Sequence, residues 1–175
     1  MNKINSSEGE LKGKEFVISR QFNAPQELVW KAFTESERLV HRWRPKGFLM
    51  VNIKLELRPG GIFHYCMKSP NGLEMWGKFV YHEIVPIEKI VFVNSFSDAG
   101  VNLTRYPLST LWPLEVHNTL TLTDENGKTT LTLKGKPINA TEEERRTFEA
   151  GFTSMQQGFK GTFDQLDIYL SKGKE

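Results

Sequence analysis

The stretch 141-TEEERRTFEAGFTSMQQGFKGTFDQLDIYL-170 decides the fold of this 175-residue chain. Seven large apolar residues recur in it at steps of 4, 3, 4, 4, 3 and 4, which places them on one face of an α-helix. They are Phe148, Phe152, Met155, Phe159, Phe163, Leu166 and Leu170. Thr141, followed three positions later by Glu144, is typical of a capping box. We therefore predict one long C-terminal helix of about 30 residues, whose apolar face needs a broad surface to cover it.

Small residues form an edge beside this apolar face. Gly151, Gly158 and Gly161 lie inside the predicted helix together with Ser154, although each glycine destabilises a helix by about 1 kcal/mol relative to alanine. Two interpretations remain open. The edge either allows a loop, a strand or a second subunit to approach closely, which we favour, or it leaves room for a ligand.

Strands upstream supply the surface that the helix needs. Alternating apolar and polar residues predict strands at 16–22, 51–57, 62–68, 74–84, 89–96, 114–122 and 129–133. Two short helices fit between the first two strands, one beginning at Pro25 and one capped by Ser36. The inward face of 74–84 is ambiguous, since two interleaved apolar sets compete for it.

Segment 98–113 shows no regular period. A loop of this length inside a compact domain is often functional, for example as a lid. The alternative, which we favour, is an insertion packed by its own Tyr106, Leu111 and Trp112.

Composition narrows the class of protein. The chain carries 23 Lys and Arg against 21 Asp and Glu, a balance that does not favour a nucleic-acid partner. The single cysteine, Cys66, excludes a disulfide within the chain, and a buried thiol is expected there. No apolar run is long enough to span a membrane, and the polar start does not resemble a signal peptide, so we expect a cytoplasmic protein.

These patterns predict a flexible tail at 1–14 and a single domain at 15–175. The fold class is α+β. A curved antiparallel sheet of about six to seven strands wraps around the long C-terminal helix, and two short helices follow the first strand.

The residues themselves resemble the START-like SRPBCC superfamily, in the branch named for the activator of heat shock protein 90 ATPase. The resemblance covers about residues 15–170. It is carried by Asn23-Ala24-Pro25, Val29-Trp30-x-Ala32-Phe33, Pro45-Lys46-Gly47-Phe48, Leu57-Arg58-Pro59-Gly60-Gly61, Met75-Trp76-Gly77-Lys78-Phe79, Glu83-Ile84-Val85-Pro86, Gly127-Lys128-Thr129-Thr130-Leu131 and Phe163-Asp164-x-Leu166-x-x-Tyr169-Leu170.

The resemblance implies a helix-grip fold with a cavity between the sheet and the long helix. Members of the superfamily include lipid and hormone carriers, polyketide cyclases and the chaperone activator, so the fold does not fix the function. The eukaryotic activator has a separate N-terminal domain, whereas 14 residues precede the domain in this sequence. We therefore do not expect a full co-chaperone role.

Apolar and aromatic residues with a few amides are typical of small-molecule pockets. The predicted ligand-binding residues, chosen from inward strand positions, the long helix and candidate closing aromatics, are Trp43, Phe48, Phe63, Tyr65, Trp76, Phe92, Asn94, Phe96, Trp112, Asn118, Met155 and Phe159. Asn94 and Asn118 stand out because each falls in phase with apolar strand positions, where a buried amide needs partners.

No catalytic or metal-binding motif is present in the sequence. Glu115 and His117 share one strand face and are candidates for a base and its orienting partner. We therefore expect no cofactor, no metal and no assigned catalytic residue. The leading hypothesis is binding of a small hydrophobic or aromatic molecule. The alternatives are a chaperone-associated interaction domain and a cyclase- or hydrolase-type enzyme that uses the same cavity.

Overall fold

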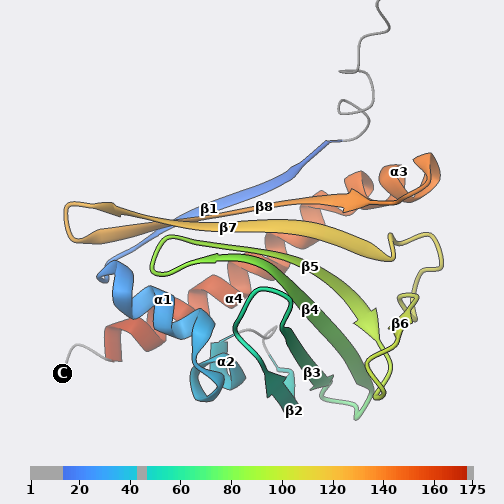
Figure 1. Cartoon of the computed structure of the whole chain (residues 1–175), viewed down its shortest axis with the longest axis horizontal. Coiled ribbons are helices and arrows are strands. Elements are labelled where there is room, and N and C mark those ends of the chain that lie inside the picture. The colour runs from blue at the N-terminus through green and yellow to red at the C-terminus, as the bar shows by residue number, and fades with distance from the viewer. Residues whose placement is uncertain (1–13, 43–46, 173–175) are drawn as a thin grey trace, which may run out of the picture.

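The computed structural model describes residues 14–42 and 47–172, so most of the predicted tail and Trp43 lie outside the described residues. One curved antiparallel sheet dominates it (Figure 1). The strands are β1 (Phe16–Phe22), β2 (Leu49–Leu55), β3 (Ile62–Lys68), β4 (Glu74–Val85), β5 (Lys89–Ser97), β6 (Leu103–Thr104), β7 (Glu115–Glu125) and β8 (Lys128–Ile138). Their order is β1-β8-β7-β5-β4-β3-β2, with β6 paired to β5. The predicted α+β class is confirmed.

Four helices complete the domain in the described ranges: α1 (Gln26–Thr34), α2 (Ser36–Arg42), α3 (Glu142–Ala150) and α4 (Phe152–Lys172). Figure 1 shows α4 crossing the sheet obliquely, with α1 and α2 near its C-terminal end and α3 at the opposite end. The two short helices after the first strand are confirmed. Pro25 is the N-cap of α1 rather than its first helical residue.

The predicted single long helix is wrong in one respect, because it is divided at Gly151. The Gly151 N–H bonds to the Phe148 carbonyl at 3.1 Å as well as to the Thr147 carbonyl at 3.2 Å, which tightens the turn. A Cβ on Gly151 would lie 3.1 Å from the Trp112 ring. One of the two hydrogen bonds of the predicted capping box is present, since the Thr141 hydroxyl accepts from the Glu144 N–H at 3.1 Å.

The ambiguity in β4 is resolved by a bulge. Phe79 and Tyr81 are buried against the helices, at 6% and 3% exposure. The register shifts between Tyr81 and Glu83, which adds one residue and turns the following side chains over. Ile84 consequently packs against the same core as Tyr81, although a step of three positions would place them on opposite faces of a regular strand.

Segment 98–113 is anchored rather than structureless. It contains β6, and Tyr106 stacks on Phe96 with ring centroids 4.5 Å apart. Trp112 packs on Phe148 at 5.4 Å. Arg105 lies 3.4 Å from the carboxylate of Glu144, which is buried. The packed-insertion interpretation therefore describes this segment better than a free lid, although Leu111 is 42% exposed.

Within residues 14–42 and 47–172 the core consists of two clusters. The larger one joins the sheet to α1, α2 and the second half of α4, where Phe163, Leu166 and Leu170 are buried. The smaller one is centred on Phe16, Val116 and Phe148.

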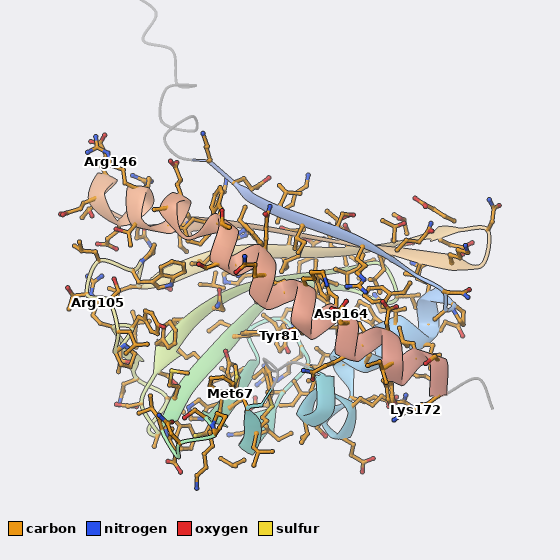
Figure 2. The ribbon with its side chains drawn as sticks, turned by 180° about the vertical axis from the view of Figure 1, so that it is seen from behind. Met67, Tyr81, Arg105, Arg146, Asp164 and Lys172 are labelled. Carbon is orange, nitrogen blue, oxygen red and sulfur yellow. The ribbon has the colours of Figure 1, made fainter. Side chains whose placement is uncertain are left out.

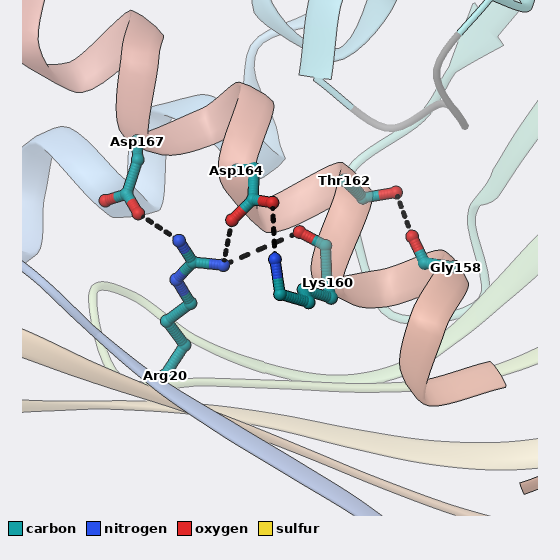
Figure 3. Close-up of polar contacts among 6 residues, drawn as sticks. All are labelled: Arg20, Gly158, Lys160, Thr162, Asp164 and Asp167. Atoms are coloured by element: carbon teal, nitrogen blue, oxygen red, sulfur yellow. Dashed lines mark hydrogen bonds and ion pairs between the residues drawn. The ribbon is translucent and has the colours of Figure 1, made fainter. Parts of the chain in front are cut away.

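A polar clamp fixes α4 on the edge strand β1 (Figure 3). The Arg20 guanidinium lies 2.6 Å from Asp164 and also pairs with Asp167. Lys160 reaches the other oxygen of Asp164 at 3.0 Å. Burial, the largest single influence, lowers the pKa of Arg20, but the pairing with Asp164 and Asp167 outweighs it and raises the pKa. The clamp holds the second half of α4 in place.

Candidate functional site: a pocket beneath the long helix

A pocket of about 370 Å³ lies between the first half of α4 and the concave face of the sheet. Figure 2 views the molecule from the helix side, with Met67 and Tyr81 on the strands beyond α4. The lining side chains come from β3, β4, β5, β7, β8 and α4. They are Tyr65, Met67, Phe79, Phe92, Asn94, Phe96, Asn118, Leu133, Met155, Gly158, Phe159 and Thr162.

Strand register brings these side chains together. Phe79 on β4 lies opposite Asn94 on β5, and Asn94 lies opposite Val116 on β7. In the neighbouring row Tyr81 lies opposite Phe92, which lies opposite Asn118. Since alternate residues share one face of a strand, these rows form the concave wall of the pocket.

The pocket has an apolar floor and an accessible rim. Phe79 and Phe92 stack at 4.3 Å, and Tyr65 crosses Phe79 edge-on at 5.7 Å. All three side chains are buried, whereas Met155 on α4 is partly exposed and Gly158 is exposed. An apolar molecule would therefore enter beside the first half of α4.

The pocket lies where the two core clusters meet without merging. Tyr65, Phe79 and Phe92 belong to the larger cluster, while Met155 packs against the smaller one. Phe159 packs against both, with its ring 5.8 Å from Phe16 and 5.9 Å from Phe163. The space left between two well-packed regions is the pocket itself.

Polar groups in the lining are few and uncharged. The Asn118 Nδ2 donates to Asn94 Oδ1 at 2.7 Å and to the Val116 carbonyl at 3.0 Å. The Thr162 hydroxyl donates to the Gly158 carbonyl at 3.2 Å (Figure 3). Burial raises the pKa of Tyr65, so its phenol stays protonated at neutral pH.

The family model described as "Activator of Hsp90 ATPase homolog 1-like protein" matches residues 23–171, which spans most of the chain and includes every pocket residue. The chain belongs to this family. Its sequence matches no curated protein.

Solved structures share the fold of this Hsp90-activator-like domain. A Mycobacterium smegmatis protein is 23% identical over 89% of this chain and 90% of its own, with a TM-score of 0.72. An Arthrobacter aurescens protein is 23% identical over 90% of this chain and 86% of its own, with a TM-score of 0.74. A Silicibacter pomeroyi structure named AHSA1 is 15% identical over 91% of this chain and 99% of its own, with a TM-score of 0.67. At these identities the likeness concerns the fold alone.

The structure of this family member brings most of the predicted ligand-binding residues to one place. Those that line the pocket are Tyr65, Phe92, Asn94, Phe96, Asn118, Met155 and Phe159. Phe63 lies just beneath, fully buried and 4.9 Å from the Tyr65 ring.

Three predicted residues are placed elsewhere in the described chain. Trp76 points to the convex side of the sheet, where it stacks on His64 at 4.9 Å. Trp112 covers Gly151 and Phe148. Phe48 lines a separate groove next to the second half of α4. None of these three lines the pocket beneath the helix.

Sequence reasoning missed five lining residues: Met67, Phe79, Leu133, Gly158 and Thr162. Met67 follows Tyr65 by two positions, a spacing that placed it on the same face. Phe79 was missed because the bulge in β4 breaks the alternation and left the inward face of this strand ambiguous. At Gly158 a Cβ would have no neighbour within 4 Å, so this glycine borders open space, unlike Gly151.

Candidate catalytic groups lie apart from the pocket. His117 is on the opposite face of β7 from Asn118, and its ring is 6.5 Å from His82. Burial, Lys136 and His82 lower the pKa of His117, which keeps the imidazole neutral. In the described residues there is no group of three or more His, Cys, Asp and Glu side chains able to hold a metal ion.

His64 is buried on the convex side and was not singled out by its sequence context. Its Nε2 lies 3.1 Å from the Ser97 hydroxyl and 3.1 Å from the Asp98 carbonyl. These contacts tie the sheet to the start of segment 98–113. Among the described helices, none has the length and apolar character needed to cross a membrane.

Proposed function

We propose that this domain binds a small, predominantly apolar molecule in the pocket beneath the first half of α4. The observation that carries the proposal is the pocket of about 370 Å³, which is lined by aromatic and aliphatic side chains and a few uncharged polar groups. Pockets of this size and composition are typical of small-ligand sites. Membership in a helix-grip family supports the same function in general terms.

Native mass spectrometry of gently purified protein, followed by solvent extraction, is the direct test. The proposal predicts a discrete co-purifying molecule, or a return of the ligand-free protein to a bound mass on exposure to aromatic compounds. Persistence of the ligand-free mass at saturating concentrations of such compounds contradicts the proposal.

Two matched variants of α4 locate the site. Phe159→Leu removes a ring from the pocket lining, so we expect weaker binding with the fold retained. Phe152→Leu makes the same change on the same helix but outside the lining, where Phe152 packs on Phe16 at 5.6 Å. Equal loss of binding in both variants would mean that the site lies elsewhere.

A second function, partner binding, has one specific observation in its favour. Leu49 at the start of the edge strand β2 is 56% exposed, and Ile168 on α4 is 57% exposed. Both line one groove together with Phe48. Because the family description names an Hsp90 ATPase activator, we propose a chaperone ATPase as the partner to test.

The test is stimulation of Hsp90 ATPase turnover by the purified domain. Stimulation that disappears in a Leu49→Ser, Ile168→Ser double variant supports this function. Unchanged turnover at a large excess of the domain contradicts it.

A further inference from the structure

Two glycines in the sheet leave space in which polar side chains of the neighbouring strand lie. A Cβ on Gly77 would lie 2.6 Å from the Tyr65 hydroxyl, so the Tyr65 phenol rests directly on the Gly77 backbone. A Cβ on Gly135 would lie 2.8 Å from Asn118 Oδ1. In each case the polar residue on one strand occupies the space left by a glycine on the next strand. Both polar residues line the pocket.

Hydrogen bonding fixes which end of each amide faces which group. The Val116 carbonyl can only accept, so the Asn118 atom 3.0 Å from it must be the nitrogen. That nitrogen also donates to Asn94, so the Asn94 atom 2.7 Å away must be its oxygen. Asn94 is left with its amino group, whose two N–H donors have no partner among the described residues.

Tyr65 adds a second donor group. Its side chain is 7% exposed, and within residues 14–42 and 47–172 its hydroxyl makes no hydrogen bond. A buried hydroxyl without a partner is costly unless a ligand or water satisfies it. Thr162 offers no competing donor, because its hydroxyl already donates to the Gly158 carbonyl.

Among the residues that the structure describes, the pocket lining contains no Asp, Glu, Lys, Arg or His. An ionised ligand would lose its hydration without gaining a countercharge, which is strongly unfavourable. A neutral oxygen acceptor, such as a carbonyl, matches the free Tyr65 hydroxyl and Asn94 amino group instead.

We infer that the ligand is an uncharged molecule with an aromatic or alicyclic body and a carbonyl-type oxygen, which accepts hydrogen bonds from the Tyr65 hydroxyl and the Asn94 amide. This inference rests on the proposed function and names the ligand class for the same pocket. Tyr65 and Asn94 are its specificity-determining residues.

Three probes of nearly equal shape test the inference: naphthyl methyl ketone, isopropylnaphthalene and naphthoate. If burial of apolar surface alone decided affinity, isopropylnaphthalene would bind most tightly, because a carbonyl loses favourable hydration on entering an apolar site. Calorimetric titration should instead place the ketone first and naphthoate last. We expect Tyr65→Phe to weaken ketone binding roughly threefold to tenfold while leaving isopropylnaphthalene unchanged.

Two further variants complete the design. Asn94→Asp retains the oxygen that accepts from Asn118 but removes the amino donors, so ketone binding should fall at pH values where the carboxyl is ionised. Tyr106→Phe removes a hydroxyl from a tyrosine outside the lining and should change nothing. Tyr65→Phe should fold normally, since it only deletes an unpaired hydroxyl.

The outcomes separate the inference from the proposed function. Binding of both neutral probes with the hydrocarbon equal or tighter overturns the inference and leaves the proposed function standing. Tightest binding of naphthoate, or an unchanged ketone preference in Tyr65→Phe, also overturns the inference. Binding of none of the probes at their solubility limits contradicts the proposed function and the inference with it.

Discussion

The two halves of α4 have the same helical geometry but opposite surroundings. In residues 162–172 one face of the helix is buried, namely Thr162, Phe163, Leu166 and Leu170. In residues 152–161 no side chain is fully buried, and Gly158 borders open space. The second half is also clamped to β1 by Arg20. The second half therefore anchors the helix to the domain, while the first half covers the pocket. We call residues 162–172 the anchor and residues 152–161 the roof.

This difference shows how a continuous apolar stripe can serve two purposes. The stripe extends from Phe148 to Leu170 and is packed against the sheet at both ends, but a pocket remains beneath its middle. Packing of the second half of α4 holds the first half above a space that the side chains of the sheet do not fill. We therefore expect the second half of α4 to determine stability and the first half to determine binding.

Truncating one phenylalanine in each half should produce the largest contrast. Phe163 is 1% exposed, so Phe163→Ala should lower the free energy of unfolding by about 3–5 kcal/mol. Phe159→Ala, beside an existing pocket, should lower it by only about 1–2 kcal/mol. Urea denaturation of both variants gives the comparison. Equal losses would mean that the roof is as tightly packed as the anchor.

Replacing Gly158, the helical glycine over the pocket, by alanine should have a moderate effect and should raise stability rather than lower it. A Cβ on Gly158 meets no atom within 4 Å, so Gly158→Ala should stabilise the protein by about 0.5–1 kcal/mol through the unfolded chain. At Gly151 the same change brings a methyl group 3.1 Å from the Trp112 ring and should gain less or destabilise. Thermal unfolding measures both variants. A loss at Gly158 would contradict the open roof.

Removing the clamp should have the smallest effect and a defined pH dependence. Lys160 and Arg20 hold the pKa of Asp164 below its usual range. A carboxyl with a lowered folded-state pKa adds stability above the unfolded pKa and loses it as the pH falls through the folded value. The stability difference between wild type and Arg20→Met should therefore be constant above about pH 5 and shrink below about pH 4.

Salt provides the control for this prediction. Exposed ion pairs weaken with ionic strength, so the same difference should shrink in concentrated sodium chloride at neutral pH. A difference that is independent of both pH and salt would show that Arg20 acts instead through its contact with the Phe22 ring, whose centroid lies 5.9 Å from the guanidinium carbon.

Sequence periodicity was enough to predict the sheet, the long apolar stripe and much of the pocket lining. Strict alternation fixed the face of Tyr65, Phe92 and Asn118, because one residue of slip would have moved each to the other side. It failed in β4, where the bulge after Tyr81 breaks the alternation. Trp76 was expected to close an opening of the pocket but lies on the convex side, stacked on His64.

Other features depend on contacts between distant segments, which no local pattern reveals. The break at Gly151 coincides with Trp112 lying against it from the segment before β7. The difference between Gly151 and Gly158 arises from what lies opposite each glycine, and their local sequence contexts do not show it. The same holds for His64, which is buried because Trp76 and Ser97 cover it.

The most direct measurement of the central claim is methyl NMR of methionine-labelled protein during addition of naphthyl methyl ketone. Met67 and Met155 line the pocket, whereas Met50 lies in the larger core cluster. The account predicts that the Met67 and Met155 methyl signals shift together and saturate, while that of Met50 stays in place. Saturating shifts at Met50 alone, or no shift at any of the three, would contradict it.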